Sequence, residues 1–526
     1  MEYLPRGKQP GGRGGAPDGR LGRLRPFRQS YGCKECAKQT RLVFTIVKVE
    51  NYGGDLPVRL LRKELPHRPG AGLRLGRLGA VACVVWLAGC ATYSPLPLGD
   101  GQGAKDASQL SADTSTMPLP ALRTHRVDLS HGMDVTDVAI LAVANNPDLK
   151  VMRDQLGVAR AQAFQAGLLP DPQVSLNQEY LTHPIPGYRT ASAFGITQDI
   201  TSLLLRSTRK AAANAQADQV NLDLLWAEWQ TIAQARQLFN QVVSLRDQQQ
   251  RLAAEQTALT PVDGYVRKAL EEGNLTYDAA SAGLNAYADA SKRLSDNTVQ
   301  LQQAEHDLRG LLGLAPEAPL QLTGEPFQAS PTPDQVDTAL ASLPQRRPDL
   351  LALQAGYKSQ EATLRGAIRA QFPALTFGLD RQSDNSGIPS HGITIGFTLP
   401  LFDRNRGNIR IETATRQQLK DDYENRVLAT RNDIRQLMLD QDTLAKQRDQ
   451  SQAHSQHLDD ARRAAESAFQ KGLLDWPTYL SIRANALTAD MDAIAARDQQ
   501  SQQAIALEAL LGSTDLQQPS VATSKP

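Results

Sequence analysis

The chain has 526 residues, with 57 lysines and arginines against 56 aspartates and glutamates. Proteins that bind nucleic acids usually carry a basic excess, so the near-zero formal charge disfavours that class of partner. Aromatic residues make up only 5% of the chain, and alanine, leucine and glutamine dominate its second half. This composition favours long helices packed through small side chains rather than one thick globular core.

A bacterial lipoprotein signal is the first motif with a clear chemical meaning. Residues 68–89 combine arginines, a short apolar run and the small residues of Leu87-Ala88-Gly89-Cys90, which matches a lipobox. The apolar run is too short to span a bilayer. We therefore predict that Cys90 is lipidated and begins the mature chain; the alternative is a chance apolar run in a leader.

The region before this signal, residues 1–67, is rich in glycine, arginine and proline. Because a signal peptide should begin a chain, we interpret residues 1–67 as an extension that results from a start assigned too far upstream. Cys33 and Cys36 form a lone CxxC pair, which is a weak zinc motif without a second pair. We expect no metal site and no disulfide.

After Cys90 the sequence predicts a linker and then the first folded region. Residues 90–130 are rich in proline, glycine, serine and aspartate, which is typical of an extended linker. Helical periodicity follows over 134–169. Strict alternation of apolar and polar residues then predicts strands at 174–180 and 194–200.

Two long helices follow. Over 206–268 apolar residues recur at threes and fours, the spacing of one helix face, with an expected interruption at Pro261 and Gly264. A break at Gly273 and Asn274 separates this helix from another at 275–312. A proline-rich segment, 315–333, precedes what comes next.

The second part of the chain repeats the first. Five short motifs recur in the same order about 200 residues later, which predicts an internal duplication. The first copy spans 131–314 and the second 334–513, with a disordered tail at 514–526. The paired motifs begin at Asn146 and Arg347, Leu169 and Phe372, Phe194 and Ile395, Lys268 and Ser467, and Leu311 and Leu510.

The four predicted strands suit a membrane better than a soluble sheet. Those of the second copy lie at 374–382 and 393–399, and all four alternate apolar with small or polar residues. Tilted strands of about 9–11 residues cross a bilayer. A sheet in hydrocarbon must close, and about eight strands are the practical minimum. Several chains would therefore share one barrel, with eight strands in a dimer or twelve in a trimer.

The long helices predict a column that stands out of the membrane. Some 60 residues of helix extend roughly 90–100 Å, and each long helix turns back at a glycine. These turns would be exposed tips suited to docking a partner. The predicted contact residues are Gly273, Asn274, Leu275, Gly472, Leu473 and Leu474.

These features resemble the TolC-like outer-membrane efflux channel family over residues 130–513. The run Leu399-Pro400-Leu401-Phe402-Asp403-Arg404-Asn405-Arg406-Gly407 is most similar to the CzcC-like heavy-metal branch. The resemblance implies a homotrimer with a twelve-stranded outer-membrane β-barrel and a periplasmic α-helical barrel. It also implies that a periplasmic adaptor, linked to an inner-membrane pump, meets the tips. The first copy departs from the pattern at Asp199-Ile200-Thr201-Ser202 and at Pro261.

The expected function is a passive exit duct for heavy-metal cations in a Gram-negative bacterium, with drug or solvent efflux or type I secretion as alternatives. A structural coiled-coil lipoprotein would not explain the four alternating runs, and no motif of catalytic or cofactor-binding residues supports an exported enzyme. His454 and His457 are three residues apart, but a solvated helix face is the simpler interpretation. Asp440, Asp442 and Asp449 would form acidic rings only if they face a lumen.

Overall fold

The computed structural model describes residues 93–111, 113–115, 117–183, 185–328 and 331–512. The predictions for residues 1–67, for the signal at 68–89, for Cys90 and for the tail at 514–526 lie outside these residues. The chain divides into two units, 1–97 and 98–526. In the first unit the described residues 93–97 are exposed and irregular.

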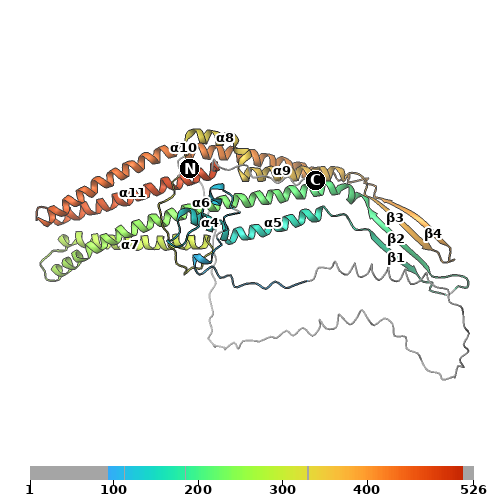
Figure 1. Ribbon diagram of the computed structural model, residues 1–526, viewed down its shortest axis with the longest axis horizontal. Coiled ribbons are helices and arrows are strands. Elements are labelled where there is room, and N and C mark those ends of the chain that lie inside the picture. The colour runs from blue at the N-terminus through green and yellow to red at the C-terminus, as the bar shows by residue number, and fades with distance from the viewer. Residues whose placement is uncertain (1–92, 112, 116, 184, 329–330, 513–526) are drawn as a thin grey trace, which may run out of the picture. The chain divides into compact units, whose positions relative to one another are not determined.

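The same order of elements occurs twice in the second unit (Figure 1). A short 3-10 helix, Ala107–Gln109, and α3 (Pro120–Arg123) precede both series. The first half contains α4 (Val135–Asn145), α5 (Pro147–Ala166), β1 (Gln173–Glu179), β2 (Ala191–Asp199), α6 (Ile200–Glu271) and α7 (Tyr277–Leu311). The second half contains α8 (Pro333–Arg346), α9 (Pro348–Arg369), β3 (Leu375–Ser383), β4 (Pro389–Phe397), α10 (Arg406–Gln470) and α11 (Trp476–Leu511).

All four predicted strands are present, and they form one antiparallel sheet in the order β1-β2-β3-β4. The β2–β3 pairing joins the two halves, since Ile196 lies opposite Leu379. β1 and β4 are the edges and have no partner on their outer sides among the described strands. No helix in the described part of the chain is long and apolar enough to cross a membrane.

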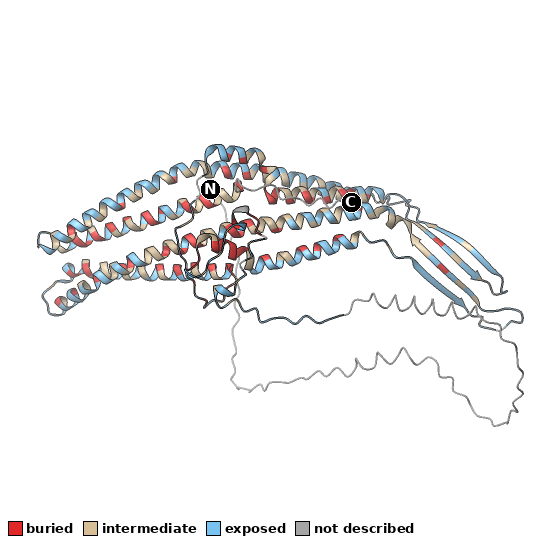
Figure 2. Ribbon diagram, in the orientation of Figure 1, coloured by how far each residue is buried: buried red, intermediate tan, exposed pale blue. Residues whose placement is uncertain are grey.

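The pairing register separates the sheet into an apolar face and a small or polar face, as the alternation predicted. The apolar side chains are largely solvent-exposed, and Figure 2 colours most of the sheet as exposed. The apolar face carries Val174, Leu176, Phe194, Ile196, Phe377, Leu379, Ile393, Ile395 and Phe397. The opposite face carries all four strand glycines, Gly195, Gly378, Gly392 and Gly396.

The helix predictions need three corrections. The segment 134–169 is two helices, because Asn146 caps α5 and Pro147 follows it. The long helix begins at Ile200 rather than near 206, because the Asp199 side chain accepts a hydrogen bond from the Ser202 backbone N–H. Pro261 does not interrupt α6; burial of Leu259 and Val266 on either side holds the helix together.

The two irregular segments are more than connections. Within the predicted linker 90–130, Met117, Leu119 and Leu122 are buried in the main core with α4, α6 and α7. The segment 315–333 contributes Leu320 to that core and pairs with the chain before α4, where the Met133 backbone N–H donates to the Gln321 carbonyl over 2.9 Å. Apolar contacts, which have no periodic sequence signal in such short pieces, fix both segments.

Candidate helix tips and channel wall

The predicted tip residues lie in two helix turns at the opposite end of the helices from the sheet (Figure 1). Gly273 and Gly472 both have positive φ angles, 72° and 70°, a conformation that glycine adopts at little cost. In each turn the next residues hydrogen-bond back to the preceding helix, as Leu473 does to the Ala468 carbonyl over 2.9 Å. The two turns therefore have the same backbone design.

The structure places the six predicted residues in these turns but does not expose them equally. Gly273, Asn274, Gly472 and Leu473 are exposed, whereas Leu275 and Leu474 are half-buried. Leu473 is 77% exposed and is the most exposed apolar side chain among the six. Sequence reasoning missed Tyr265 and Tyr277, two exposed tyrosines beside the first turn.

An aromatic cluster fixes the second hairpin behind its tip. The rings of Phe469 and Tyr479 stack with centroids 4.5 Å apart, and Trp476 lies against α7. A Cβ added at Gly283 on α7 would lie 3.0 Å from Val266 Cγ2 of α6 and 3.4 Å from the Trp476 indole, so this glycine lets α7 lie close to α6 beside the indole. The two hairpins thus pack together through side chains directly behind the tips.

A buried ion pair links the same two hairpins. Arg483 on α11 contacts Glu255 on α6 over 2.5 Å and also donates to the Tyr479 hydroxyl over 2.9 Å. Burial works against the charged guanidinium, but Glu255 more than offsets it and raises the pKa of Arg483. Losing either partner would leave a buried charge unpaired.

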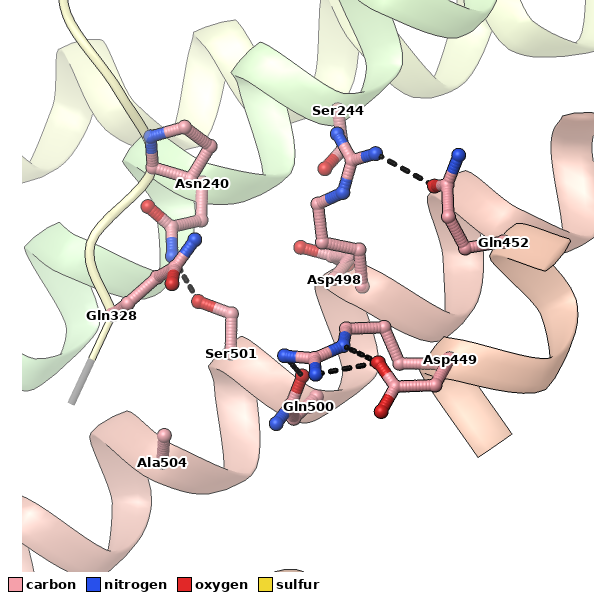
Figure 3. A pocket seen from close by; sticks show the side chains of 12 residues that line it. Asn240, Ser244, Gln328, Asp449, Gln452, Asp498, Gln500, Ser501 and Ala504 are labelled. Atoms are coloured by element: carbon pink, nitrogen blue, oxygen red, sulfur yellow. Dashed lines mark hydrogen bonds and ion pairs between the residues drawn. The ribbon is translucent and has the colours of Figure 1, made fainter. Parts of the chain in front are cut away.

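A polar cavity of about 290 Å³ lies between α6, α10, α11 and the segment near 327 (Figure 3). Asn240 on α6 and Ser501 on α11 both hold the Phe327 carbonyl, over 3.0 and 2.6 Å. Burial raises the pKa of the Asp498 carboxyl at the cavity wall. These contacts tie the inter-half segment to both halves, and nothing in the cavity resembles a catalytic arrangement.

The histidines and carboxylates named from the sequence do not gather into a site. His454 and His457 are exposed on α10. Asp442 pairs with Lys446 over 2.6 Å, Asp449 pairs with Arg448 over 2.6 Å, and Asp440 accepts from Gln436 over 3.0 Å. Neighbouring side chains on α10 therefore already engage these carboxylates.

One group in the described part of the chain has the composition of a metal site: His125, Asp134 and Asp137. Asp134 and Asp137 form the capping box of α4, and each accepts hydrogen bonds from backbone N–H groups. His125 contacts Asp137 over 2.9 Å. The positive end of a helix disfavours a cation, so the arrangement serves the helix cap.

The sequence is similar to those of known outer membrane proteins. Residues 339–513 match the family model described as outer membrane efflux protein. The multidrug resistance outer membrane protein MdtQ of Escherichia coli O6:H1 is 24% identical over 492 residues, covering 82% of this chain and 97% of MdtQ. The cobalt-zinc-cadmium resistance protein CzcC of Cupriavidus metallidurans is 25% identical over 234 residues, 43% of this chain and 54% of CzcC.

The fold is also that of a solved channel. The Campylobacter jejuni CmeC outer membrane channel superposes with a TM-score of 0.61 at 15% identity, over 80% of this chain and 95% of that one. The resemblance to TolC-like outer-membrane efflux channels is confirmed, and the matched family consists of channel proteins rather than enzymes.

Proposed function

We propose that this chain, a relative of the outer membrane efflux channels, forms a homotrimeric exit duct that conducts substrates from an inner-membrane pump and a periplasmic adaptor to the outside. The observation that carries the proposal is that the sheet and the helix layer end on consecutive elements of the chain: α5 and β1 at one edge, and β4 and α10 at the other. β1 and β4 are the open edges of the sheet. The helices that flank them also lie at the ends of the helix layer: α5, before β1, packs mainly on α6, and α10, after β4, packs on α9 and α11.

The likeness of the two halves supports a helix of a neighbouring copy as the element that completes this layer. In the second half, α9 packs against both α6 and α10. Its counterpart in the first half, α5, packs against α6, but its other flank has no second long helix among the described residues. The equivalent partner is α10 of a neighbouring copy, which would continue the layer into a ring.

One contact within the chain indicates which residues would meet at this proposed interface between copies. Ser359 on α9 donates to the Ala212 carbonyl of α6 over 2.9 Å. At the offset of about 200 residues between the halves, the corresponding positions are Val158 on α5 and the neighbourhood of Ile411 on α10. Val158 is 57% exposed and Ile411 63% exposed. Two exposed apolar side chains stand where the proposed contact between copies requires them.

The sheet supports the same assembly. Its exposed apolar face suits lipid, and its unpaired edges must close in hydrocarbon, where backbone groups cannot remain unsatisfied. Three copies with four strands each would give a twelve-stranded barrel, with the small, polar face inward. The helices would continue it as a periplasmic α-barrel that ends at the tips.

Cysteine cross-linking tests the assembly directly. A chain carrying Val158→Cys and Ile411→Cys should form dimers and trimers on a non-reducing gel after mild oxidation. The control pair is Val158→Cys with Leu439→Cys, because Leu439 is at least as exposed as Ile411 but lies far along α10. Equal cross-linking of both pairs, or of neither, would count against the ring.

Conductance tests the duct. Purified protein in planar bilayers should produce channel events, since the proposal requires a continuous water-filled path. A structural lipoprotein or an enzyme with this fold would remain silent. Failure to conduct, in the native chain and in chains altered at the tips, would overturn the proposal.

The tips are proposed as the adaptor contacts. Leu473→Asp places a charge on an exposed apolar tip residue and should abolish cellular efflux while bilayer conductance persists. Leu439→Asp lies away from the tips and serves as the control for adaptor binding. Unchanged efflux in the Leu473→Asp cell would remove the tip from the contact.

The substrate class is a separate part of the proposal. The name of CzcC, with the Pro400 to Gly407 run, supports heavy-metal cations, and the name of MdtQ supports drugs. Cells that lack this protein should lose resistance to cobalt, zinc or cadmium in the first case. Loss of drug resistance alone would support the second.

Lipid anchoring is proposed at Cys90, which lies outside the described residues. Cells supplied with labelled palmitate should label the native protein but not Cys90→Ser. Labelling of the Cys90→Ser protein would disprove the lipobox assignment.

A further inference from the structure

The small, polar face of the sheet carries negative charge and no positive charge. In the four described strands its ionisable residues are Glu179, Asp199 and Asp380, all carboxylates. The basic residues of these strands, Arg381 and His391, lie opposite each other on the apolar face. A charge imbalance of this kind does not follow from the overall composition, which is nearly neutral.

Asp380 differs from the other two carboxylates in its position. Asp199 ends β2 and caps α6, and Glu179 ends the edge strand β1. Asp380 lies within the inner strand β3, where its neighbours across the sheet are Gly195 and Gly392. Because glycines flank it on both sides, no neighbouring side chain in its row covers the carboxylate.

The carboxylate is nevertheless held in place. The Thr394 hydroxyl donates to Asp380 Oδ1 over 2.9 Å. A Cβ added at Gly392 would lie 2.6 Å from Asp380 Oδ2, so the side chain lies directly over the glycine backbone. No ion pair joins Asp380 to any residue within the described ranges, and its charge is therefore not neutralised by the protein.

Close contacts on this face centre on its glycines. A Cβ at Gly195 would lie 2.6 Å from Ser175 Oγ, and one at Gly396 would lie 2.6 Å from Thr376 Oγ1. In both pairs the side chain of the cross-strand partner lies over the glycine, and glycines of this kind allow a sheet to bend as it closes. All four strand glycines lie on this one face, which is the face that a closed barrel would turn toward its lumen.

We propose that Asp380 determines the ion preference of the channel and makes it select cations. This inference rests on the proposed trimeric duct, in which three copies of Asp380 form one ring at the same height in the barrel. A ring of unneutralised carboxylates raises the local concentration of cations and repels anions. The favoured substrates are then cationic, whether metal ions or organic cations.

Ion selectivity in planar bilayers tests the proposal. Under a KCl gradient the reversal potential should show that the native channel prefers K⁺ to Cl⁻. Asp380→Asn keeps the shape of the side chain and an oxygen for Thr394, but removes the charge. We expect the permeability ratio to fall roughly threefold or more, since the ring is a fixed negative charge on the face that would line the ion path.

The neighbouring residue is the matched control. Arg381→Gln also removes one charge per chain, but from the opposite face, so the permeability ratio should not change. Asp380→Glu restores the carboxylate and should restore the cation preference. Gly392→Ala keeps the charge while displacing it, and should weaken the preference less than Asp380→Asn does.

The outcomes distinguish a failure of the proposed duct from a failure of the proposed role of Asp380. A native protein without conductance overturns the duct and this inference with it. A conducting native channel whose selectivity is the same in Asp380→Asn overturns the inference alone. An equal change in Arg381→Gln would also overturn it, because the effect would then not depend on the face.

Discussion

α6 and α10 occupy equivalent places in the two halves, yet only α6 is a core helix. Fourteen residues of α6 are buried, against five of α10. α6 packs against α4, α5, α7, α9 and α11, whereas α10 packs against α9 and α11. Similar length and periodicity therefore do not imply similar burial. The difference teaches that α10 forms an outer flank of this chain, which we propose a neighbouring copy covers.

The residues that precede α5 and α9 also differ between the two halves. Asn146 caps α5 by accepting a hydrogen bond from the Leu149 backbone N–H over 3.0 Å. Arg347, its counterpart, is fully buried, pairs with Asp349 over 2.7 Å and lies over the Trp226 ring of α6. In the first half Asn146 acts within its own half, since it caps α5 and donates to the Leu311 carbonyl of α7 over 3.2 Å. In the second half Arg347 is a charge that also contacts the other half.

The largest expected effect tests the difference between the long helices. Phe239 on α6 is fully buried, and Phe239→Ala should destabilise the fold by about 3–5 kcal/mol because it leaves a cavity. Ile411 on α10, at the proposed contact between copies, is 63% exposed. Ile411→Ala should lower the thermal unfolding midpoint only to the extent that copies associate, so that its effect shrinks as the protein is diluted and the copies separate.

Thermal unfolding in detergent over a range of protein concentrations distinguishes the two. A concentration-independent loss for Ile411→Ala as large as that for Phe239→Ala would show that α10 is a core helix of the single chain.

The next largest effect concerns the residues that precede α5 and α9. Arg347→Ala leaves Asp349 with Arg426 alone, and removing one partner of a buried ion pair costs about 3 kcal/mol or more. Asn146→Ala removes a helix cap and should cost about 1 kcal/mol. The measurement is the shift of the unfolding midpoint for each variant. Equal shifts would mean that the buried ion pair of Arg347 contributes no more to stability than the Asn146 cap.

The smallest effect is a pH dependence confined to the second half. Burial opposes the Asp349 carboxylate, but Arg347 and Arg426 more than offset it and hold its pKa below the ordinary value of 3.8. A depressed pKa stabilises the fold above the unfolded-state pKa, and that stability disappears as the pH falls through the folded-state pKa.

Asp349→Asn should therefore destabilise the protein at neutral pH, and its difference from the native chain should shrink in acid. The control is Asp148→Asn, which changes the equivalent but exposed residue in the first half and should have little effect. A difference for Asp349→Asn that stayed constant from neutral to acidic pH would exclude the ion pair as its source.

Sequence reasoning succeeded where the signal was periodic and failed where it was not. The alternation of Ile393 and Ile395 with small residues predicted both a strand and its two faces. Met117 and Leu320 have no periodic neighbours, so their burial in the core could not be foreseen. Pro261 misled for another reason: a local rule predicted a break, but packing along α6 keeps the helix continuous.

The tips show the same limit at the candidate site. Glycines at 273 and 472 marked the turns because a positive φ angle has a residue preference. The stacking of Phe469 on Tyr479 and the approach of Trp476 to Gly283 depend on helices that are distant in sequence. Nothing in the sequence pairs them.

By itself the sequence determined the order of elements, the repetition of that order, the two faces of each strand and the places where the helices turn. All of these are local, because they depend on periodicity and on backbone preferences within a few residues. Only the tertiary structure decided that α6 is buried and α10 is not, that Arg347 contacts Trp226, and that Asp380 lies between two glycines. Those outcomes depend on which surfaces meet, and the free energy of burial belongs to the pair of surfaces rather than to either one alone.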